Sequence, residues 1–208
     1  MSRPLIDASR LDAFTDGIFA IAATLLVLEL TTHSIGKVST SGQLWAGFVD
    51  MGDQFISFAV SFLLLCLLWM AHVQQFVYIA RVDNKSMWIN VGRLLFIVLI
   101  PFSTVVDAEY DSVWLGRMIL PASFFPAILM GWLSWVYVCR HRELLVADIE
   151  QADIDQFSRR SLTAVVLSAI SVLLSPFVGA WAFLAFALDP VIGAIGKRHQ
   201  SASAEKAE

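Results

Sequence analysis

The chain has 208 residues, of which 58% are apolar and only 15% are charged. An average soluble domain is about 45–50% apolar and about 25% charged. A soluble globule of this size could not hide so much apolar surface, so the composition excludes a disordered chain and argues against a soluble enzyme. The net charge of −4 without a basic patch excludes a nucleic-acid binder. The sequence therefore predicts an all-helical membrane protein that crosses the bilayer several times.

Five charge-poor stretches follow a charged amino-terminal segment, in which we expect no signal peptide. A spanning helix needs about 20 mostly apolar residues. The stretches are residues 17–30, 54–80, 86–106, 118–139 and 161–196. The polar segment 140–160 reads as a linker between the fourth and fifth stretches.

The fifth stretch is too long for one span. As one helix it would reach about 54 Å at 1.5 Å per residue, whereas the hydrocarbon core is about 30 Å thick. Ser175, Pro176 and Gly179 lie near its middle, where they favour a turn. We therefore predict a hairpin and six spans, with a six-helix transmembrane domain over 1–199 and a disordered tail over 200–208.

The basic residues set the expected orientation. Cytoplasmic loops of membrane proteins carry an excess of Lys and Arg. If the amino terminus is cytoplasmic, six spans place on that side Arg3, Arg10, Arg81, Lys85, Arg140, Arg142, Arg159, Arg160, Lys197 and Arg198. Only Lys37 falls in an outer loop, and Arg117 lies at the start of the fourth span. The sequence thus predicts a multi-pass protein of the cell membrane with both termini in the cytoplasm.

The first span differs from the others because polar residues recur within it. Asp16, Thr24 and Glu29 would be costly against lipid, so this helix is expected to face the protein interior or water. Ile21, Thr24 and Leu28 stand at i, i+3 and i+7, which places them on one face. The alternative is that Thr24 bonds back to its own helix and that this stripe packs in a core.

Several motifs in the first half of the chain form a pattern. They are R-L-D-A-F-T-D-G at 10–17, T-L-L-V-L-E-L at 24–30, W-M-A-H at 69–72, W-I-N at 88–90 and P-F at 101–102. Together they resemble the first three helices of prokaryotic members of the transmembrane protein 175 family, which are relatives of the lysosomal potassium channel. The resemblance covers residues 10 to 105 by motif and the remaining spans by number only. Thr15 stands where the family usually has Ser, so a hydroxyl is kept.

The resemblance implies a homotetramer of six-helix subunits that conducts potassium and other monovalent cations through the bilayer. It implies that the first helix of each subunit lines the pore, with the bottleneck at Ile21 and further layers at Thr24 and Leu28. The chain has no T-V-G-Y-G segment, so a filter of backbone carbonyls of that kind is absent from the sequence. We expect no cofactor, and no metal ion beyond permeating potassium.

The resemblance also implies that Arg10, Asp16 and His72 brace the first helix, with Trp69 and Asn90 in the same network. Arg10 and Asp16 point to different sides of one continuous helix, so a partner from another helix or subunit is expected to join them. The alternative is that Asp16 caps a helix that begins near Gly17. Asn90 is expected to form a helix–helix hydrogen bond.

Two other classes of function compete with a channel. One is an intramembrane enzyme, although the chain has neither G-x-S-x-G nor H-E-x-x-H. The other is a proton-coupled transporter or proton channel that uses Asp16 and His72. Secondary transporters often contain internal repeats, and the sequence shows no convincing one. Passive current, as opposed to saturable exchange or turnover, separates the three classes.

Overall fold

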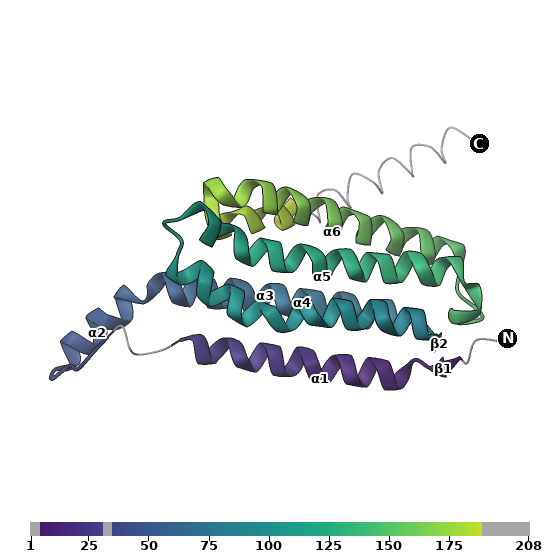
Figure 1. Ribbon diagram of the computed structural model, residues 1–208, viewed down its shortest axis with the longest axis horizontal. Helices are drawn as coiled ribbons and strands as arrows, with labels where there is room; N and C mark the ends of the chain where they lie inside the picture. Colours follow the sequence, from purple (N-terminus) through teal and green to yellow (C-terminus); the bar gives the residue numbers. More distant parts are fainter. Residues whose placement is uncertain (1–4, 31–34, 189–208) are drawn as a thin grey trace, which may run out of the picture.

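A computed structural model of the chain describes residues 5–30 and 35–188. The helices of the described part are joined by loops, and its two named strands are two residues long each. Five helices are long and apolar enough to cross a membrane, and they lie side by side in one elongated bundle (Figure 1). They are α1 (Ser9–Leu25, continued by the short 3₁₀ helix η1, Leu26–Glu29), α3 (Gly52–Phe76), α4 (Asn84–Glu109), α5 (Trp114–Arg140) and α6 (Gln151–Val178). The predicted all-helical, multi-pass architecture is therefore confirmed.

Two of the long helices begin earlier than predicted. Helix α1 starts at Ser9 instead of residue 17, and α6 starts at Gln151 within the expected polar linker. The charged first turns of both helices are amphipathic, because Leu11 and Ile154 are buried while Arg10 and Asp155 are exposed. The alternative in which Asp16 caps a helix start is wrong, since Asp16 lies in the middle of α1.

The start of α4 is fixed by local chemistry. The Asp83 carboxylate accepts a hydrogen bond from the Ser86 backbone N–H at 2.8 Å, and the Ser86 hydroxyl accepts one from the Asp83 N–H at 2.9 Å. This reciprocal capping satisfies backbone donors that a helix leaves unpaired at its start. The Tyr137 hydroxyl donates to the same carboxylate and so ties the end of α5 to the start of α4.

The chain reverses at Gly179, in the segment where the turn was predicted. Gly179 ends α6 with φ 59° and ψ −140°, a backbone region that is open almost only to glycine. The 3₁₀ helix η4 (Gly179–Leu188) then runs back along α6, and the Ser171 hydroxyl donates to the Ala182 carbonyl at 3.0 Å. The rest of the predicted sixth span and the tail 200–208 lie outside the described residues.

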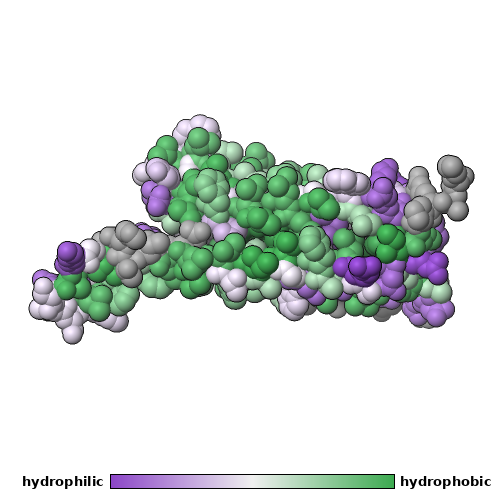
Figure 2. Space-filling view, turned by 60° about the horizontal axis from the view of Figure 1, so that its bottom comes forward, coloured by the Kyte–Doolittle hydropathy of each residue, from purple (hydrophilic) through white to green (hydrophobic). Residues whose placement is uncertain are grey.

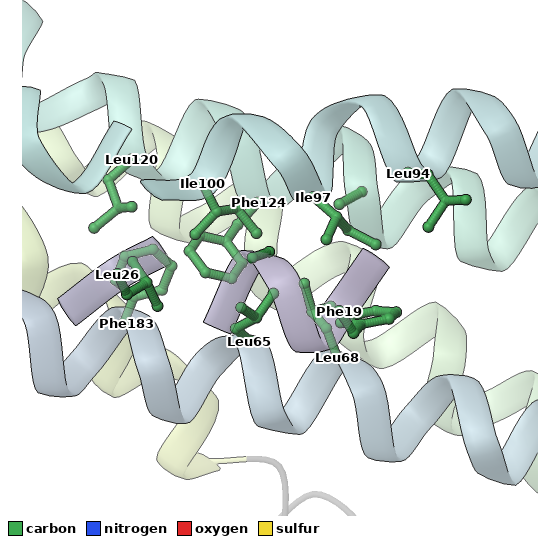
Figure 3. Packing of buried hydrophobic residues seen from close by; sticks show 12 residues of the cluster. Phe19, Leu26, Leu65, Leu68, Leu94, Ile97, Ile100, Leu120, Phe124 and Phe183 are labelled. Carbon is green, nitrogen blue, oxygen red and sulfur yellow. The ribbon is translucent and has the colours of Figure 1, made fainter. Parts of the chain in front are cut away.

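The central core lies where α1, α3, α4 and α5 meet, with Phe183 of η4 beside them (Figure 3). Its buried residues are Phe19, Ala22, Leu26, Leu65, Leu68, Leu94, Ile97, Ile100, Leu120, Phe124, Ala127 and Phe183. Inside a bilayer, lipid tails are as apolar as these side chains, so helix association depends on close packing and hydrogen bonds. The packing of the core therefore determines which helix faces meet, and the polar contacts described below fix the position of α1 against α3 and α4.

A second cluster closes the end of the bundle at which the two strands lie, which we call the strand end. Strand β1 (Ile6–Asp7) pairs antiparallel with β2 (Arg81–Val82), placing Ile6 opposite Val82. The cluster's buried residues are Ala8, Leu11, Ile79, Val82, Trp135, Tyr137, Val138, Leu144, Leu145 and Ile154. The short sheet thus ties the start of α1 to the connection between α3 and α4.

The surface is divided as a membrane protein requires. Apolar residues cover the middle of the bundle, and hydrophilic residues gather at the strand end (Figure 2). Helix α2 (Ser41–Asp50), which the sequence reading missed, projects from the opposite end (Figure 1). It carries exposed apolar side chains, among them Trp45 and Val49, and its first turn is capped by the Thr40 hydroxyl. A helix of ten residues lacks the length that identifies a span.

Candidate functional site: the first helix and its polar anchors

Helix α1 has one buried and one uncovered face. The uncovered face, which we call the open face, carries Phe14, Gly17, Ile21, Thr24 and Leu28 at alternating spacings of three and four. Ile21 is 57% exposed and Leu28 is 67% exposed, and a Cβ built on Gly17 would meet no atom within 4 Å. The structure therefore places the three predicted residues Ile21, Thr24 and Leu28 on one face that no other described part of the subunit covers.

Thr24 combines features of both interpretations of this stripe. Its hydroxyl donates to the Ile21 carbonyl at 2.9 Å, which is the back-bond expected from a helical threonine. The side chain is nevertheless exposed on the open face, so it does not pack in a core. Because the hydroxyl proton is used within the helix, the oxygen retains its lone pairs as acceptors. A surface of this kind can accept a hydrogen bond or contribute to a cation's ligand shell.

The buried face of α1 is held by three polar side chains, which we call the polar anchors: Asp12, Thr15 and Asp16. The Asn90 amide of α4 donates to the Thr15 hydroxyl at 2.8 Å, and both residues are buried. The indole N–H of Trp69 in α3 donates to Asp16 Oδ1 at 2.8 Å. The Asp12 Oδ1 atom lies 3.1 Å from His72 Nε2 of α3. All three anchors lie within the first half of α1, near the strand end.

The surroundings of His72 assign its tautomer. A guanidinium group of Arg93 lies 3.4 Å from His72 Nδ1 and also donates to the Leu68 carbonyl at 3.3 Å. Because a guanidinium has donors only, Nδ1 must accept, so a neutral ring carries its proton on Nε2, opposite Asp12. Arg93, His72 and Asp12 thus form a continuous polar chain from α4 through α3 to α1.

The same assignment bears on metal binding. Ligand atoms of Asp12, Asp16 and His72 all lie within 4.8 Å of one another, which is close enough to hold an ion. A metal would need a free lone pair on Nε2, but the contact of Nδ1 with Arg93 keeps the proton there. The Asp16 oxygen is also engaged by Trp69. The donor set therefore fits a brace, made of the Trp69 hydrogen bond and the close His72–Asp12 contact, better than a metal centre.

The residues expected in the brace are only partly brought together. Asp16 and His72 lie close to each other, and Trp69 and Asn90 each donate a hydrogen bond to α1. The sequence analysis expected such a helix–helix bond from Asn90. Arg10 is exposed, and within the described residues it forms no ion pair with Asp16 or His72. Asp12 and Arg93 take the corresponding places, and the sequence reading gave neither of them this role. Their spacing was a usable signal, because Asp12 precedes Asp16 by four residues on one helix face.

These features define a multi-pass helical membrane protein whose first helix is anchored on one side and open on the other. Residues 10–101 match the family described as endosomal/lysosomal potassium channel TMEM175. This match confirms, over the same segment, the resemblance read from the motifs. This is a channel family and not an enzyme family, so the expectation of a non-enzymatic protein agrees with it.

Individual relatives match the chain over different lengths. A potassium channel of Streptomyces collinus is 36% identical over 104 residues, which are 50% of this chain and 49% of that relative. The chain thus spans about half the length of this relative. A potassium channel of Chamaesiphon minutus is 29% identical over 185 residues, covering 81% of this chain and 88% of the relative.

A crystal structure of a lysosomal potassium-selective channel TMEM175 homolog, also from Chamaesiphon minutus, shares the fold. It superposes with a TM-score of 0.67 at 23% identity, covering 90% of this chain and 95% of that one. The similarity extends past the motif-bearing half of the sequence, so the helical architecture is shared over nearly the whole chain.

Proposed function

We propose that this chain is a channel that passively conducts potassium and other monovalent cations, and that four copies assemble around α1. The open face of α1, in a chain that matches a channel family over residues 10–101, is the observation that carries the proposal. A face at membrane depth that combines glycine, threonine and apolar residues is poorly suited to lipid alone, because a polar group there favours a protein or water partner.

Several copies are required because one helix per subunit cannot enclose a path for ions. The spacing of three and four along the open face is the pattern by which helices pack side by side at a small crossing angle. Cyclic closure around an axis is the usual symmetry of such assemblies. We infer a homotetramer of six-span subunits.

Each residue of the open face has a proposed part. Ile21 forms an apolar ring at the bottleneck, where dewetting can gate the path. Thr24 offers its lone pairs to a partly dehydrated cation, and Leu28 forms a further apolar layer. Arg10 is free to contact a neighbouring subunit, whereas Asp16, His72, Trp69 and Asn90 hold the helix from behind.

Proton transport is the second candidate, because Asp12, Asp16 and His72 lie together at the strand end. Their position on the buried side of α1, opposite Ile21, favours a brace over a conducting path. A pH readout in the flux assay below distinguishes the two, since proton movement without potassium would support the alternative.

We further propose that the protein lies in the cell membrane with both termini in the cytoplasm. Arg10, Arg81, Lys85, Arg140 and Arg142 all belong to elements at the strand end, which supports a cytoplasmic strand end. A cysteine placed at Ser203 should resist labelling from outside intact cells. Labelling there would overturn the orientation or the number of spans.

The conduction proposal is tested by cation flux from purified protein in liposomes, with potassium and sodium compared directly. Ile21→Asn should wet the bottleneck, raise flux and reduce discrimination, whereas Thr24→Ala should shift the potassium-to-sodium ratio. Thr163→Ala on α6 is the control, because Thr163 is a half-buried threonine away from α1 whose hydroxyl also bonds back to its own helix, at 3.0 Å. Ile170→Asn controls for an exposed isoleucine on α6. Unchanged permeation in both α1 variants would show that α1 does not line the path.

A further inference from the structure

A groove of about 680 Å³ lies between α3, α5, α6 and η4, away from the open face of α1. Its lining changes character along its length. Toward the middle of the bundle it is apolar, with Leu64, Phe124, Ile128, Phe183 and Phe186 among its residues. At the strand end the lining is polar and comprises Gln74, Gln75, Arg93, Arg160 and Ser161.

The polar end continues into a smaller recess of about 270 Å³, which shares Gln74, Phe157 and Arg160 with the groove. Tyr78, Gln156 and Asp153 also line this recess. The two cavities together therefore form an amphipathic space: a long apolar part, and a polar part that holds two arginines and one carboxylate.

Two positive charges in this space lack a counter-charge. Arg93 is only 4% exposed, and its Nε atom has no hydrogen-bond partner within the described residues. Over residues 5–30 and 35–188, neither Arg93 nor Arg160 forms an ion pair with a carboxylate. A buried charge is costly unless it is paired. The groove thus offers unpaired positive charge to an anion, directly beside its apolar lining.

We propose that this groove binds one anionic phospholipid, with its phosphate against Arg160 and Arg93 and an acyl chain along the apolar lining. A lipid can enter a groove between spanning helices directly from the surrounding bilayer, which contains anionic phospholipids. Basic pockets between spanning helices on the cytoplasmic side are suited to acidic head groups. The proposal does not depend on what the protein conducts.

The test uses the full chain purified in mild detergent, and native mass spectrometry counts the lipid retained per subunit. Phosphatidylglycerol should be retained and phosphatidylcholine should not. Arg160→Gln should weaken retention about tenfold, the effect of losing about 1.4 kcal/mol of a charge-assisted hydrogen bond. Arg160→Lys should restore most of it. Arg159→Gln is the matched control, because Arg159 is the adjacent exposed arginine and does not line the groove.

A second variant tests the apolar part of the site. Ala164 lines the groove and Val166 faces away from it on the same helix. Ala164→Phe should therefore displace the lipid, whereas Val166→Phe should not. Size-exclusion chromatography confirms that each variant keeps the wild-type fold and assembly before its lipid is counted.

Three outcomes would overturn the proposal. Equal weakening by Arg159→Gln and Arg160→Gln would indicate general surface attraction. Retention of a fatty acid in place of the phospholipid would assign the groove to another amphiphile. A cysteine at Ala164 that cross-links to residues 189–199, or to a second copy, in a wild-type-like assembly without bound lipid would show that protein fills the groove.

Discussion

The hydrogen bond between Asn90 and Thr15 offers a sharp test of how α1 is held. Thr15 is fully buried and Asn90 is 3% exposed, so water cannot replace either partner. Thr15→Val keeps the shape and removes the hydroxyl, which leaves an amide donor buried without its acceptor. Asn90→Leu removes the amide, but the Thr15 hydroxyl can then bond back to the carbonyl four residues earlier. We therefore expect Thr15→Val to be the more damaging single substitution.

The expected loss of stability can be estimated from the cost of leaving the Asn90 amide donor buried without an acceptor. An unsatisfied buried donor costs about 1–3 kcal/mol, whereas hydrogen bonds between membrane helices show coupling of about 0.6 kcal/mol on average and about 1.7 at most. We expect Thr15→Val to cost about 1–2 kcal/mol and the double variant to cost less than the sum of the singles. The coupling should fall between about 0.6 and 1.7 kcal/mol.

The measurement is a double-mutant cycle by reversible denaturation in detergent micelles, with Thr15→Ser as the control that retains the hydroxyl. Thr15→Ser loses only a methyl group and should keep the coupling to Asn90. If the two single effects simply add in the double variant, the bond does not hold α1 and the reasoning about polar anchors fails.

Three further predictions concern other parts of the chain. Asp107 is buried and one of its oxygens has no partner within the described residues, so Asp107→Asn, which keeps an acceptor for Ser57, should leave the thermal midpoint unchanged or raised; a lower midpoint would reveal a counter-cation. Hydrogen bonds from the Ser9 hydroxyl and backbone N–H lower the pKa of Asp7 below 3.8, so the stability that they contribute is complete above pH 3.8 and is lost as pH falls through the lowered pKa; the protection of the Ser9 amide against exchange, relative to an unstructured peptide at the same pH, should then fall, and Asp7→Asn should show no such step. Gly179→Ala should cost about 1–3 kcal/mol in the same denaturation assay because of its backbone conformation, whereas Gly92→Ala in α4, with room for a Cβ, should not destabilise the protein; equal effects would refute the strain argument.

The sequence predicted the spans because bilayer thickness imposes a length that composition reveals. The four stretches that begin at 17, 54, 86 and 118 each coincide with most of one long helix, and the turn near Gly179 was visible because Pro and Gly break helices. The helix starts were less predictable. A charged turn that is half buried, as in the first turns of α1 and α6, looks like a loop in a hydropathy profile.

For the candidate site on α1, the sequence predicted which residues share a helix face but not which residues pair across helices. Helical geometry alone places Ile21, Thr24 and Leu28 on one face, and the structure shows that face uncovered. Which residue pairs with which across helices depends on the axial shift between helices, and one sequence does not contain it. Thus Asp16 was expected to join Arg10 and His72, whereas Trp69 binds Asp16 and His72 faces Asp12.

Helix α1 is held more firmly at its amino-terminal half than at its carboxyl-terminal half, so it can tilt about the anchored half. Within the described residues its side-chain hydrogen bonds to other helices end at Asp16, and beyond that point Phe19, Ala22 and Leu26 hold it by packing in the core. Leu28 lies twelve residues further on, or about 18 Å at 1.5 Å per residue. A tilt of about 5° about the anchored end displaces Leu28 by about 1.5 Å, while the Trp69 and Asn90 contacts barely lengthen. A small tilt of α1 about its anchored half would thereby change the width of the proposed pore at the level of Leu28.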